Sequence, residues 1–528
     1  MKRYIFIIVA MMWCCLSFAQ QPEDTIADLQ QVEQAAAQTV AAAEAQAVEV
    51  VDQTGEEAVP EAAGLGDEMA MNQTQAEEKA AGAAENPYKS VLTQKKFSFN
   101  IVSILRGLCG MAVIILIAWL FSSDRKRINW GTVFKALALQ FVIAVSVLMF
   151  PAVQTIFEVM GKCFVAVLDW TKAGSLFLFG DLMDPSKFGF IFVLQILPTI
   201  IFFSALTSLF FYLGILQKIV WAMGWCLTKL MRLSGAESLS CAGNIFLGQT
   251  EAPLLVKEYI PRMTKSELML VMTAGMATMA GGVLAAYIGM LGGGDKLMEI
   301  EFAKHLLSAS VMAAPGAIAL SKIVVPQTEE VDNSVEVSNE KIGKNVLDAI
   351  SNGTADGLKL AANVGAMLLV FYALIAGFNF IFGKIGDITS LNDVIASATD
   401  GRYTALSMEF ILSYLFYPVI WLTGINAADL PLVGRLLGEK LILTEFVGYQ
   451  SLATMIQAGA FVSTKSVILA TYVLCGFANF ASVGIQIGGI GSIAPAKRHV
   501  LSAHGFRALL TASLVALMSA AMMGMFLE

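Results

Sequence analysis

The chain has 528 residues, of which 57% are hydrophobic and only 14% are charged, and its mean hydropathy is +0.69. Soluble domains carry roughly 25% charged residues, so this chain has too little polar surface for a water-soluble body. The composition therefore excludes nucleic-acid-binding proteins and disulfide-rich scaffolds. The net charge of -8 lies in one segment, because 21–100 hold 15 acidic and 4 basic residues.

The beginning of the chain has the features of an exported protein. Residues 1–20 contain Lys2 and Arg3, an apolar run and a small-residue ending at Ala19, which are the three parts of a secretory signal peptide. We expect cleavage near Ala19, and an uncleaved membrane anchor is the alternative. The segment 21–97 is acidic, rich in Ala, Glu and Gln and poor in aromatic residues. It is expected to be a disordered or only transiently helical periplasmic extension.

The remainder is predicted to be an all-α polytopic membrane protein with eight transmembrane helices, because its apolar runs approach the roughly 20 residues that a spanning helix needs. The spans are placed at 98–121, 131–150, 188–213, 267–291, 302–324, 357–384, 463–490 and 502–527. We divide this region into four parts: scaffold helices at 98–235, a first hairpin with its following helices at 236–324, a cytoplasmic linker with the sixth span and an interfacial helix near 405–423 at 325–425, and a second hairpin with the last two spans at 426–528.

Basic loops follow every odd-numbered span in this prediction. Export of the acidic segment makes the first span run inward, and Lys and Arg are enriched in cytoplasmic loops. Both chain ends are then expected outside the cell. The charges that support this orientation are the loop SSDRKRINW, then Lys218, Lys229 and Arg232, then Lys322, Lys341 and Lys344, then Lys497, Arg498 and Arg507, with Asp295, Glu299 and Glu301 on the outer side.

The orientation holds only if two further apolar pieces, 236–262 and 426–455, enter and leave the membrane on the same side. Each has a Thr-Glu pair at its middle, which ends in Glu251 and Glu445 respectively. An ionisable side chain at membrane depth is costly and normally faces a cavity or a partner. Because three predicted spans separate the two pieces, they approach from opposite faces. This pattern is typical of two opposed re-entrant hairpins in the inverted repeat of a transporter.

Each predicted hairpin precedes a span that is interrupted by small and polar residues. The sequences are VMTAGMATMAGGVLAAYIGML in the first half and YVLCGFANFASVGIQIGGIG in the second. The glycines alone are compatible with close helix packing. Several glycines beside Thr278, Asn479 and Ser482 instead favour unwound stretches whose carbonyls are free to hold an ion.

Four motifs together resemble the concentrative nucleoside transporters, the NupC-like cation–nucleoside symporters: GQTEAPLLVKEYIPRMTKSE, NVGAML, GEKLILTEFVGY and CGFANFASVGIQIGGIGSIAPAKR. The resemblance covers about 98–528. It implies an elevator-type transporter that works as a homotrimer in the lipid of the bacterial inner membrane. It further implies nucleoside import coupled to sodium ions, with protons as the alternative coupling ion, and no organic cofactor.

The resemblance also implies roles for individual residues. A carboxylate can accept hydrogen bonds from both vicinal hydroxyls of a ribose, an amide can match the donors and acceptors of a base edge, and a hard cation prefers oxygen ligands. The implied nucleobase contacts are Gln249, Thr250, Glu251 and Val283; the ribose contacts are Glu445, Asn479 and Ser482 with Phe477 nearby; the sodium ligands are Asn244, Thr278 and the carbonyls of Leu247 and Met279.

Two positions depart from the family pattern: Thr444 stands where many members have Asn, and Thr278 where some relatives have Ser. Gly248 has no side chain to crowd the base, so purine as well as pyrimidine nucleosides are expected to be accepted. A channel would need a more polar lining than these spans provide. An intramembrane enzyme would use Glu251 and Glu445 as a carboxylate pair, but no His, Cys or metal-ligand cluster accompanies them, so the chain is not expected to be an enzyme.

Overall fold

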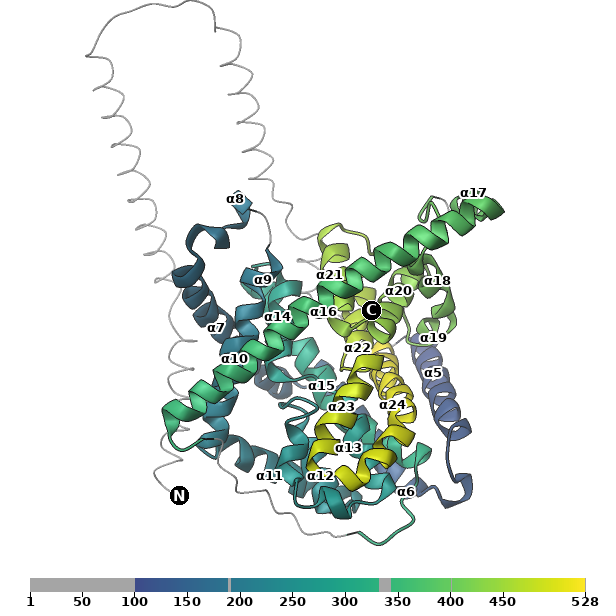
Figure 1. Cartoon of the computed structure of the whole chain (residues 1–528). Coiled ribbons are helices and arrows are strands. Elements are labelled where there is room, and N and C mark those ends of the chain that lie inside the picture. The colour runs from purple at the N-terminus through teal and green to yellow at the C-terminus, as the bar shows by residue number, and fades with distance from the viewer. Residues whose placement is uncertain (1–99, 189–190, 332–342, 400, 528) are drawn as a thin grey trace, which may run out of the picture. The chain divides into compact units, whose positions relative to one another are not determined.

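The computed structural model describes residues 100–188, 191–331, 343–399 and 401–527, which belong to one unit of the chain (Figure 1). Every element in these ranges is an α-helix or a short 3-10 helix. The predicted signal peptide at 1–20 and the acidic extension at 21–97 lie outside the described residues.

Eight single or joined helices in the described ranges are long and apolar enough to cross a membrane. The number of candidate spans agrees with the prediction, but only seven of the eight coincide with predicted spans. They are α5 (Ile101–Leu120), α6 (Trp130–Met149), α7 with η2 (Pro151–Met183), α9 with α10 (Phe192–Tyr212), α13 with α14 (Lys265–Gly292), α15 (Lys296–Val324), α16 (Val346–Thr389) and η6 with α24 (Pro495–Gly524).

Helix α7 (Pro151–Phe179) is the candidate span that the sequence prediction did not include. It carries charges along its length: Glu158 and Lys162 form an ion pair of 3.2 Å with side chains 40–44% exposed, and Asp169 pairs with Lys296 at 2.9 Å. Exposed charges in the hydrocarbon layer are costly. The length of α7 therefore permits a crossing, whereas its charges favour a place at the membrane surface.

The predicted span 463–490 is two short helices, α22 (Thr464–Leu474) and α23 (Phe480–Ile493). Gly476 lies in the interruption with a φ of +85°, a left-handed conformation that favours glycine. A Cβ at Gly476 would lie 2.5 Å from the carbonyl oxygens of Ala277 and Met276, so the two chain segments touch there. The unwound stretch that the small and polar residues predicted is thus present, and neither half alone is long enough to span a bilayer.

The other interrupted span, 267–291, divides in the same way into α13 (Lys265–Ala277) and α14 (Gly281–Gly292). Helix α13 begins with a capping box, in which Thr264 and Glu267 satisfy each other's backbone amides. It ends at Thr278, whose extended backbone stops the helix. Helices α13 and α22 therefore both end inside the protein.

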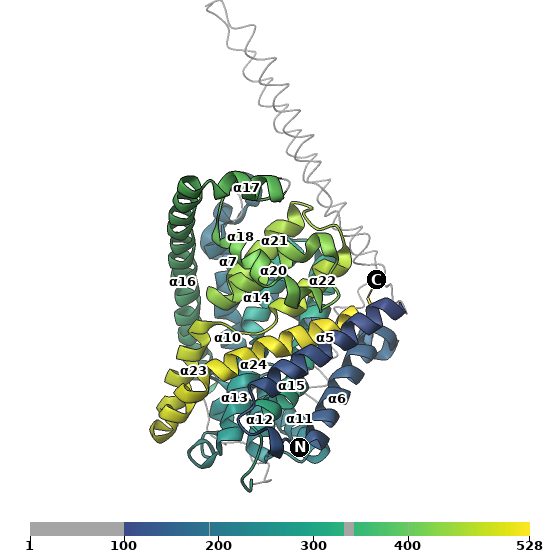
Figure 2. The same cartoon turned by 90° about the vertical axis from the view of Figure 1, so that its right-hand side faces the viewer.

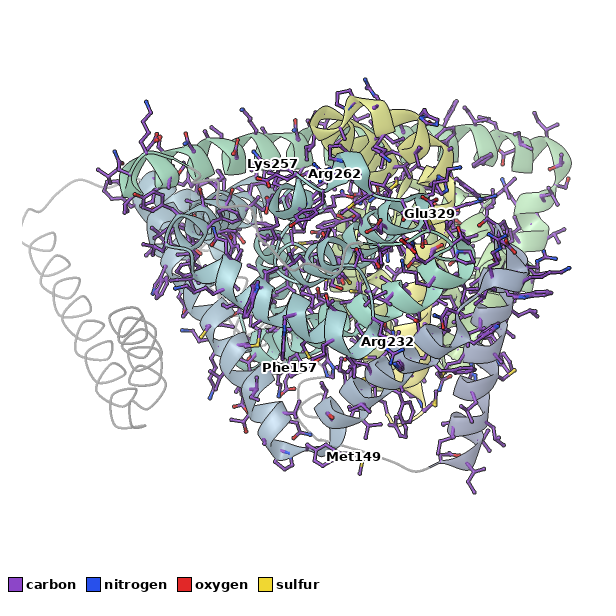
Figure 3. The ribbon with its side chains drawn as sticks, turned by 90° about the horizontal axis from the view of Figure 1, so that it is seen from below. Met149, Phe157, Arg232, Lys257, Arg262 and Glu329 are labelled. Atoms are coloured by element: carbon purple, nitrogen blue, oxygen red, sulfur yellow. The ribbon has the colours of Figure 1, made fainter. Side chains whose placement is uncertain are left out.

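Each of the two Thr-Glu segments forms a series of short helices. The first consists of α12 (Gly235–Gly243), an irregular tip, η3 (Ala252–Val256) and η4 (Ile260–Arg262); the second consists of η5 (Ala427–Asp429), α20 (Leu430–Ile442) and α21 (Glu445–Gln457). In Figures 1 and 2 the segment with α12 and the segment with α20 and α21 lie toward opposite ends of the helices between them. Figure 3 shows the molecule from the end that holds α12. Arg232 precedes α12 in the sequence, and Lys257 and Arg262 follow η3.

The longest helix, α16 (Val346–Thr389), has 44 residues, and its most apolar stretch has no buried residue. Its first half packs along α10 (Leu197–Tyr212), where a Cβ at Gly353 would lie 2.5 Å from Ser208 and one at Gly357 would lie 2.8 Å from Ser204. The predicted interfacial helix at 405–423 is two helices, α18 (Met408–Leu415) and α19 (Tyr417–Trp421). The remaining elements are η1 (Arg125–Arg127), η2 (Gly180–Met183), α8 (Pro185–Phe188), α9 (Phe192–Gln195), α11 (Ile215–Met231) and α17 (Leu391–Ala398).

Candidate functional site

The tip of the first segment is fastened to the interruption between α13 and α14. The amide of Gly281 donates to the carbonyl of Phe246 at 3.0 Å. Ser310 of α15 accepts a hydrogen bond from the amide of Met279 at 3.3 Å and donates to the carbonyl of Ile245 at 3.4 Å. The structure thus brings together the two stretches that hold the predicted sodium ligands.

Asn244 is the most informative member of that set. Its side chain is fully buried, and among the described residues neither its amide oxygen nor its amide nitrogen has a hydrogen-bond partner. Buried polar groups are nearly always hydrogen-bonded, so an unpaired carboxamide here indicates a place for a polar ligand. Asn244 also forms the C-terminal cap of α12, which fixes its backbone.

The other predicted sodium ligands supply oxygen atoms only. The hydroxyl of Thr278 donates to the carbonyl of Ala274 at 2.8 Å and keeps its lone pairs free to accept. Leu247 and Met279 are buried and can contribute carbonyls. Within the described ranges no group of three His, Cys, Asp or Glu side chains is placed to hold a metal. An all-oxygen set without such a cluster suits a hard cation such as sodium better than a transition metal.

The second Thr-Glu pair places Glu445 at the start of α21, where it is 5% exposed. The hydroxyl of Tyr287 donates to Oε1 at 3.1 Å, and the amide of Asn479 donates to Oε2 at 2.7 Å. Tyr287 comes from α14 and Asn479 caps α23, where it accepts a bond from the amide of Ser482 at 2.8 Å. The carboxylate of Glu445 therefore joins three elements.

Tyr287 is a site residue that the sequence reasoning missed, because it stands in an apolar run and looks like a core side chain. It is fully buried, and its ring stacks on that of Tyr449 with centroids 4.0 Å apart. Val283 lies one helical turn earlier on α14, so the two side chains share a face of the helix. This spacing from Val283 was the available signal.

The two tips are connected through α23. The side-chain amide of Gln249 donates to the hydroxyl of Ser482 at 3.1 Å. Thr250 packs against the same helix, since a Cβ at Gly489 would lie 2.9 Å from its methyl group. A hydrogen-bonded series therefore runs from Gln249 through Ser482 and Asn479 to Glu445. Among the described residues the amide oxygen of Gln249 has no partner, so it is available to a ligand.

Within the part of the chain that the structure describes, Glu251 makes no hydrogen bond to this series. Its carboxylate turns back to accept from the amide of Gly248 at 3.2 Å. It lines a cavity between the first tip, α10, α14 and α16, in which Phe203 and Asp356 also take part. Glu251 therefore faces this cavity, whereas Glu445 belongs to the hydrogen-bonded series that begins at Gln249. Phe477 lies in the α22–α23 interruption, where it is 9% exposed.

A second missed residue, Gln486, braces the same region. Its amide donates to the carbonyl of Met272 at 3.1 Å, and it packs so closely on α13 that a Cβ at Gly275 would lie 2.6 Å from it. Gln486 is fully buried. A lone amide in the apolar run GIQIGGIG was the sequence signal that could have identified it.

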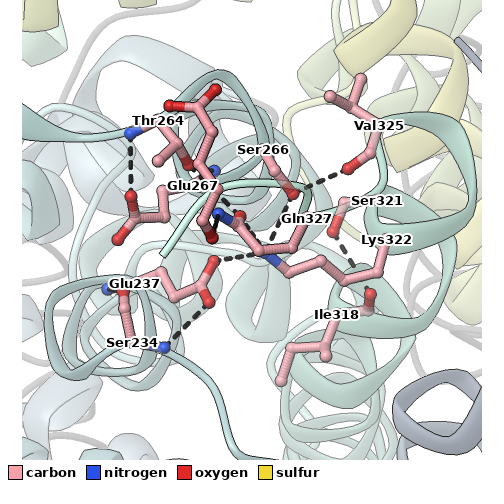
Figure 4. Close-up of polar contacts among 11 residues, drawn as sticks. Ser234, Glu237, Thr264, Ser266, Glu267, Ile318, Ser321, Lys322, Val325 and Gln327 are labelled. Carbon is pink, nitrogen blue, oxygen red and sulfur yellow. Dashed lines mark hydrogen bonds and ion pairs between the residues drawn. The ribbon is translucent and has the colours of Figure 1, made fainter. Parts of the chain in front are cut away.

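The base of the first segment is held by a buried ion pair (Figure 4). The ammonium of Lys322 contacts the carboxylate of Glu237 at 2.6 Å and the hydroxyl of Ser266 at 3.1 Å, and the paired side chains are 4% and 1% exposed. The contacts tie the beginnings of α12 and α13 to the end of α15. Lys322 was predicted to be a charge of a cytoplasmic loop. That assignment is wrong, because its side chain is buried and neutralised within the helices.

Comparison with known proteins identifies the chain's relatives. Models of the Na+ dependent nucleoside transporter family match 109–182 (N-terminus) and 305–524 (C-terminus), and a nucleoside recognition model, Gate, matches 193–294. An uncharacterized transporter of Haemophilus influenzae is 40% identical and is aligned over 81% of this chain and 98% of its own length. Rat solute carrier family 28 member 3 is 38% identical over 79% of this chain, which spans 58% of that protein's length. Rat sodium/nucleoside cotransporter 1 is 38% identical over 80% of this chain, which spans 63% of its length.

Solved structures agree with this assignment. CNTnw in an inward-facing substrate-bound state is 38% identical, with a TM-score of 0.72 over 80% of this chain and 98% of that one. A variant of CNTnw in an intermediate state gives a TM-score of 0.73 over 80% of this chain and 100% of that one. The family is one of transporters rather than enzymes. The chain is therefore an integral membrane protein that belongs to the concentrative nucleoside transporter family.

Proposed function

We propose that this chain imports nucleosides across the bacterial inner membrane and couples their uptake to sodium. The observation that carries the proposal is the hydrogen-bonded series from Gln249 of the first tip to Glu445 of the second. It gathers an amide suited to a base and a carboxylate suited to a ribose beside one helix end. The mammalian relatives are named as sodium/nucleoside cotransporters.

The nucleoside binds, in this proposal, by exchanging hydrogen bonds within that series. Glu445 accepts from the two ribose hydroxyls, and Asn479 and Ser482 contact the same sugar. Gln249 turns its amide from Ser482 to the edge of the base, against which Val283 packs. A carboxylate has lone pairs beyond those that Tyr287 and Asn479 use, so the sugar adds to these contacts without displacing both.

Thr250 and Phe477 complete the enclosure of the nucleoside. Glu251 acts from the base side, because it is two residues from Gln249 and faces the cavity that adjoins the tip. Gly248 leaves space at the base, and a purine as well as a pyrimidine is therefore accepted.

Sodium is the second substrate, held by Asn244, Thr278 and the carbonyls of Leu247 and Met279. Leu247 is two residues before Gln249, so a cation that draws the tip onto the α13–α14 interruption also positions the amide that reads the base. Coupling of this kind is reciprocal: sodium raises nucleoside affinity by the same factor by which the nucleoside raises sodium affinity.

Transport itself is proposed to be an elevator-like movement of the two segments with their interrupted helices against α10 and α16. Both segments are taken as re-entrant hairpins, both chain ends lie outside, and the working unit is a homotrimer. The placement of α12 and of α20 toward opposite ends supports the inverted arrangement. The exposed apolar length of α16 is available to lipid and to neighbouring protomers.

Uptake into proteoliposomes that contain the full chain tests the proposal. Labelled uridine is offered with an inward sodium gradient, and sodium is replaced by choline in a second series, each at a neutral and an acidic pH. We expect accumulation that requires sodium and does not require the acidic medium. Accumulation in choline driven by external acid would replace sodium by protons as the coupling ion, and absence of uridine accumulation in every medium would contradict nucleoside transport.

A further inference from the structure

Lys440 of α20 is fully buried at the end of another helix. Its ammonium donates to the carbonyl of Cys475 at 2.5 Å and to that of Val473 at 3.1 Å. Both carbonyls lie where α22 ends and the interruption before α23 begins. Lys440 is not one of the residues proposed to bind the nucleoside or sodium.

The ammonium of Lys440 is held without an ion pair. Within the described ranges no carboxylate lies at ion-pair distance from it, whereas the other buried lysine, Lys322, contacts Glu237 at 2.6 Å. A buried charge is costly unless it is compensated. The last carbonyls of a helix have no intrahelical partner and carry partial negative charge. The carbonyl oxygens of Val473 and Cys475 at the end of α22 therefore contact the ammonium, as carbonyl oxygens contact a bound metal cation.

Among the described residues, no lysine takes the corresponding place in the first segment, 236–324. There the helix before the tip ends in Asn244, whose amide is buried and has no partner among the described residues. The tip of the first segment is hydrogen-bonded to the interruption after α13, directly and through Ser310. In the second segment, Lys440 attaches α20 to the interruption after α22. At this place the second segment (426–528) carries a cation of its own, and the first segment (236–324) has a buried amide without a partner among the described residues.

The two interruptions are also in direct contact. The thiol of Cys475 lies 3.6 Å from the carbonyl oxygen of Ala277, and Gly476 is pressed against the same carbonyl. The end of α13 and the end of α22 therefore meet.

We propose that Lys440 is a tethered cation, which takes in the second repeat the place that exchangeable sodium takes in the first. This inference rests on the proposed sodium site at Asn244 and Thr278. Lys440 is a positioning residue: it holds the end of α22 against α20 whether or not sodium is bound. Asn479 and Ser482 therefore keep their positions, and only the first segment responds to sodium.

Two substitutions in the full-length protein test the inference. Lys440→Met removes the charge and nearly conserves the length, and Lys440→Ala also opens the space that the ammonium occupies. In detergent, we expect uridine affinity to fall at least tenfold in both variants. In Lys440→Ala, ethylammonium chloride should partly restore uridine affinity, and it should not change the uridine affinity of the natural protein. The dependence of uridine binding on sodium should also become steeper in this variant, because a second cation is then required.

The matched control is the paired buried lysine. The double variant Glu237→Gln with Lys322→Met should change uridine affinity less than twofold and show no response to ethylammonium. Uridine affinity and sodium dependence in Lys440→Met equal to those of the natural protein would overturn the role of Lys440 alone. If the natural protein itself binds uridine without any dependence on sodium, the proposed sodium site fails instead, so the two failures are distinguishable.

Discussion

Gln249 donates a hydrogen bond to Ser482 over 3.1 Å, and this bond joins residues that are 233 positions apart in the sequence. It connects the tip of the first segment to the first turn of α23, which is capped by Asn479. Because Asn479 also bonds Glu445, the amide of one tip and the carboxylate of the other belong to one polar cluster. The proposed nucleoside site is this whole cluster rather than any single residue.

Replacement of Glu445 by Gln should nearly abolish uridine uptake. The carboxylate is the acceptor proposed for both ribose hydroxyls, and hydrogen bonds to charged groups contribute about 1.5–3 kcal/mol each, so the uridine Kd should rise by at least about tenfold. Equilibrium binding measures the change. The control is Glu409→Gln, which alters a carboxylate bonded to Asn379 away from the tips. Near-normal uridine affinity in a folded Glu445→Gln protein would remove the ribose assignment.

Replacement of Tyr287 by Phe tests the residue that sequence reasoning missed. The variant keeps the ring stacked on Tyr449 and removes only the hydroxyl that donates to Glu445. Loss of one hydrogen bond to a charged group costs about 1.5–3 kcal/mol of stability, so the Tm should fall. Because this hydroxyl also orients the Glu445 carboxylate, uridine affinity should fall as well. The matched Tyr449→Phe removes a hydroxyl that donates to the Thr471 carbonyl instead. A larger loss of uridine affinity in Tyr449→Phe would contradict this account.

Replacement of Asn244 by Ala should separate sodium binding from folding. The amide has no partner among the described residues, and an unsatisfied buried polar group costs about 1–3 kcal/mol. In sodium-free buffer the variant should therefore melt no lower than the natural protein. Added sodium should no longer raise its Tm. The exposed Asn352→Ala serves as the control, and a sodium-dependent Tm shift of normal size in Asn244→Ala would exclude this residue as a ligand.

The buried ion pair makes a prediction about stability. Lys322→Met leaves the Glu237 carboxylate buried and uncompensated, which costs about 3–5 kcal/mol. Glu237 also accepts from the backbone amide of Ser234, so Gln rather than an apolar residue is the suitable second change. The double variant Lys322→Met with Glu237→Gln should recover most of the lost Tm. Equal Tm values for the single variant and the natural protein would show that the pair is not important for stability.

Gly248→Ala tests the space beside the base. A Cβ at Gly248 would lie 3.6 Å from Glu251 and 3.7 Å from Ala280, which are ordinary contacts, so the variant should fold normally. We expect adenosine and uridine to compete for uptake by the natural protein. In Gly248→Ala the larger adenosine should lose affinity more than uridine does. Absence of competition in the natural protein would show that purines are not accepted.

Much of the fold could be predicted because the bilayer imposes simple lengths on apolar helices. The spans at 98–121 and 131–150 match α5 and α6 closely, and the glycines and polar residues of 463–490 indicated the interruption around Gly476. Helix α7 escaped prediction because its charges, such as Glu158 and Lys162, divide an otherwise apolar run. Their exposed positions become clear only from the packing.

The site was harder to predict where the role of a side chain depends on the residues that pack around it. Asn479, Ser482 and Glu445 stand out in apolar surroundings, and the structure brings them together. Tyr287 is indistinguishable by composition from a core aromatic residue. Lys322 was predicted to be a loop charge and Lys440 was given no role, because sequence alone does not show the carboxylate or the helix end that receives each ammonium.

Equilibrium binding of uridine to the purified full chain at increasing sodium concentration is the most direct test of a pocket in which both ligands meet. The account predicts that sodium lowers the uridine Kd and that uridine lowers the sodium concentration for half-saturation by the same factor, with both effects lost in Asn244→Ala. A uridine Kd that is the same with and without sodium would contradict it.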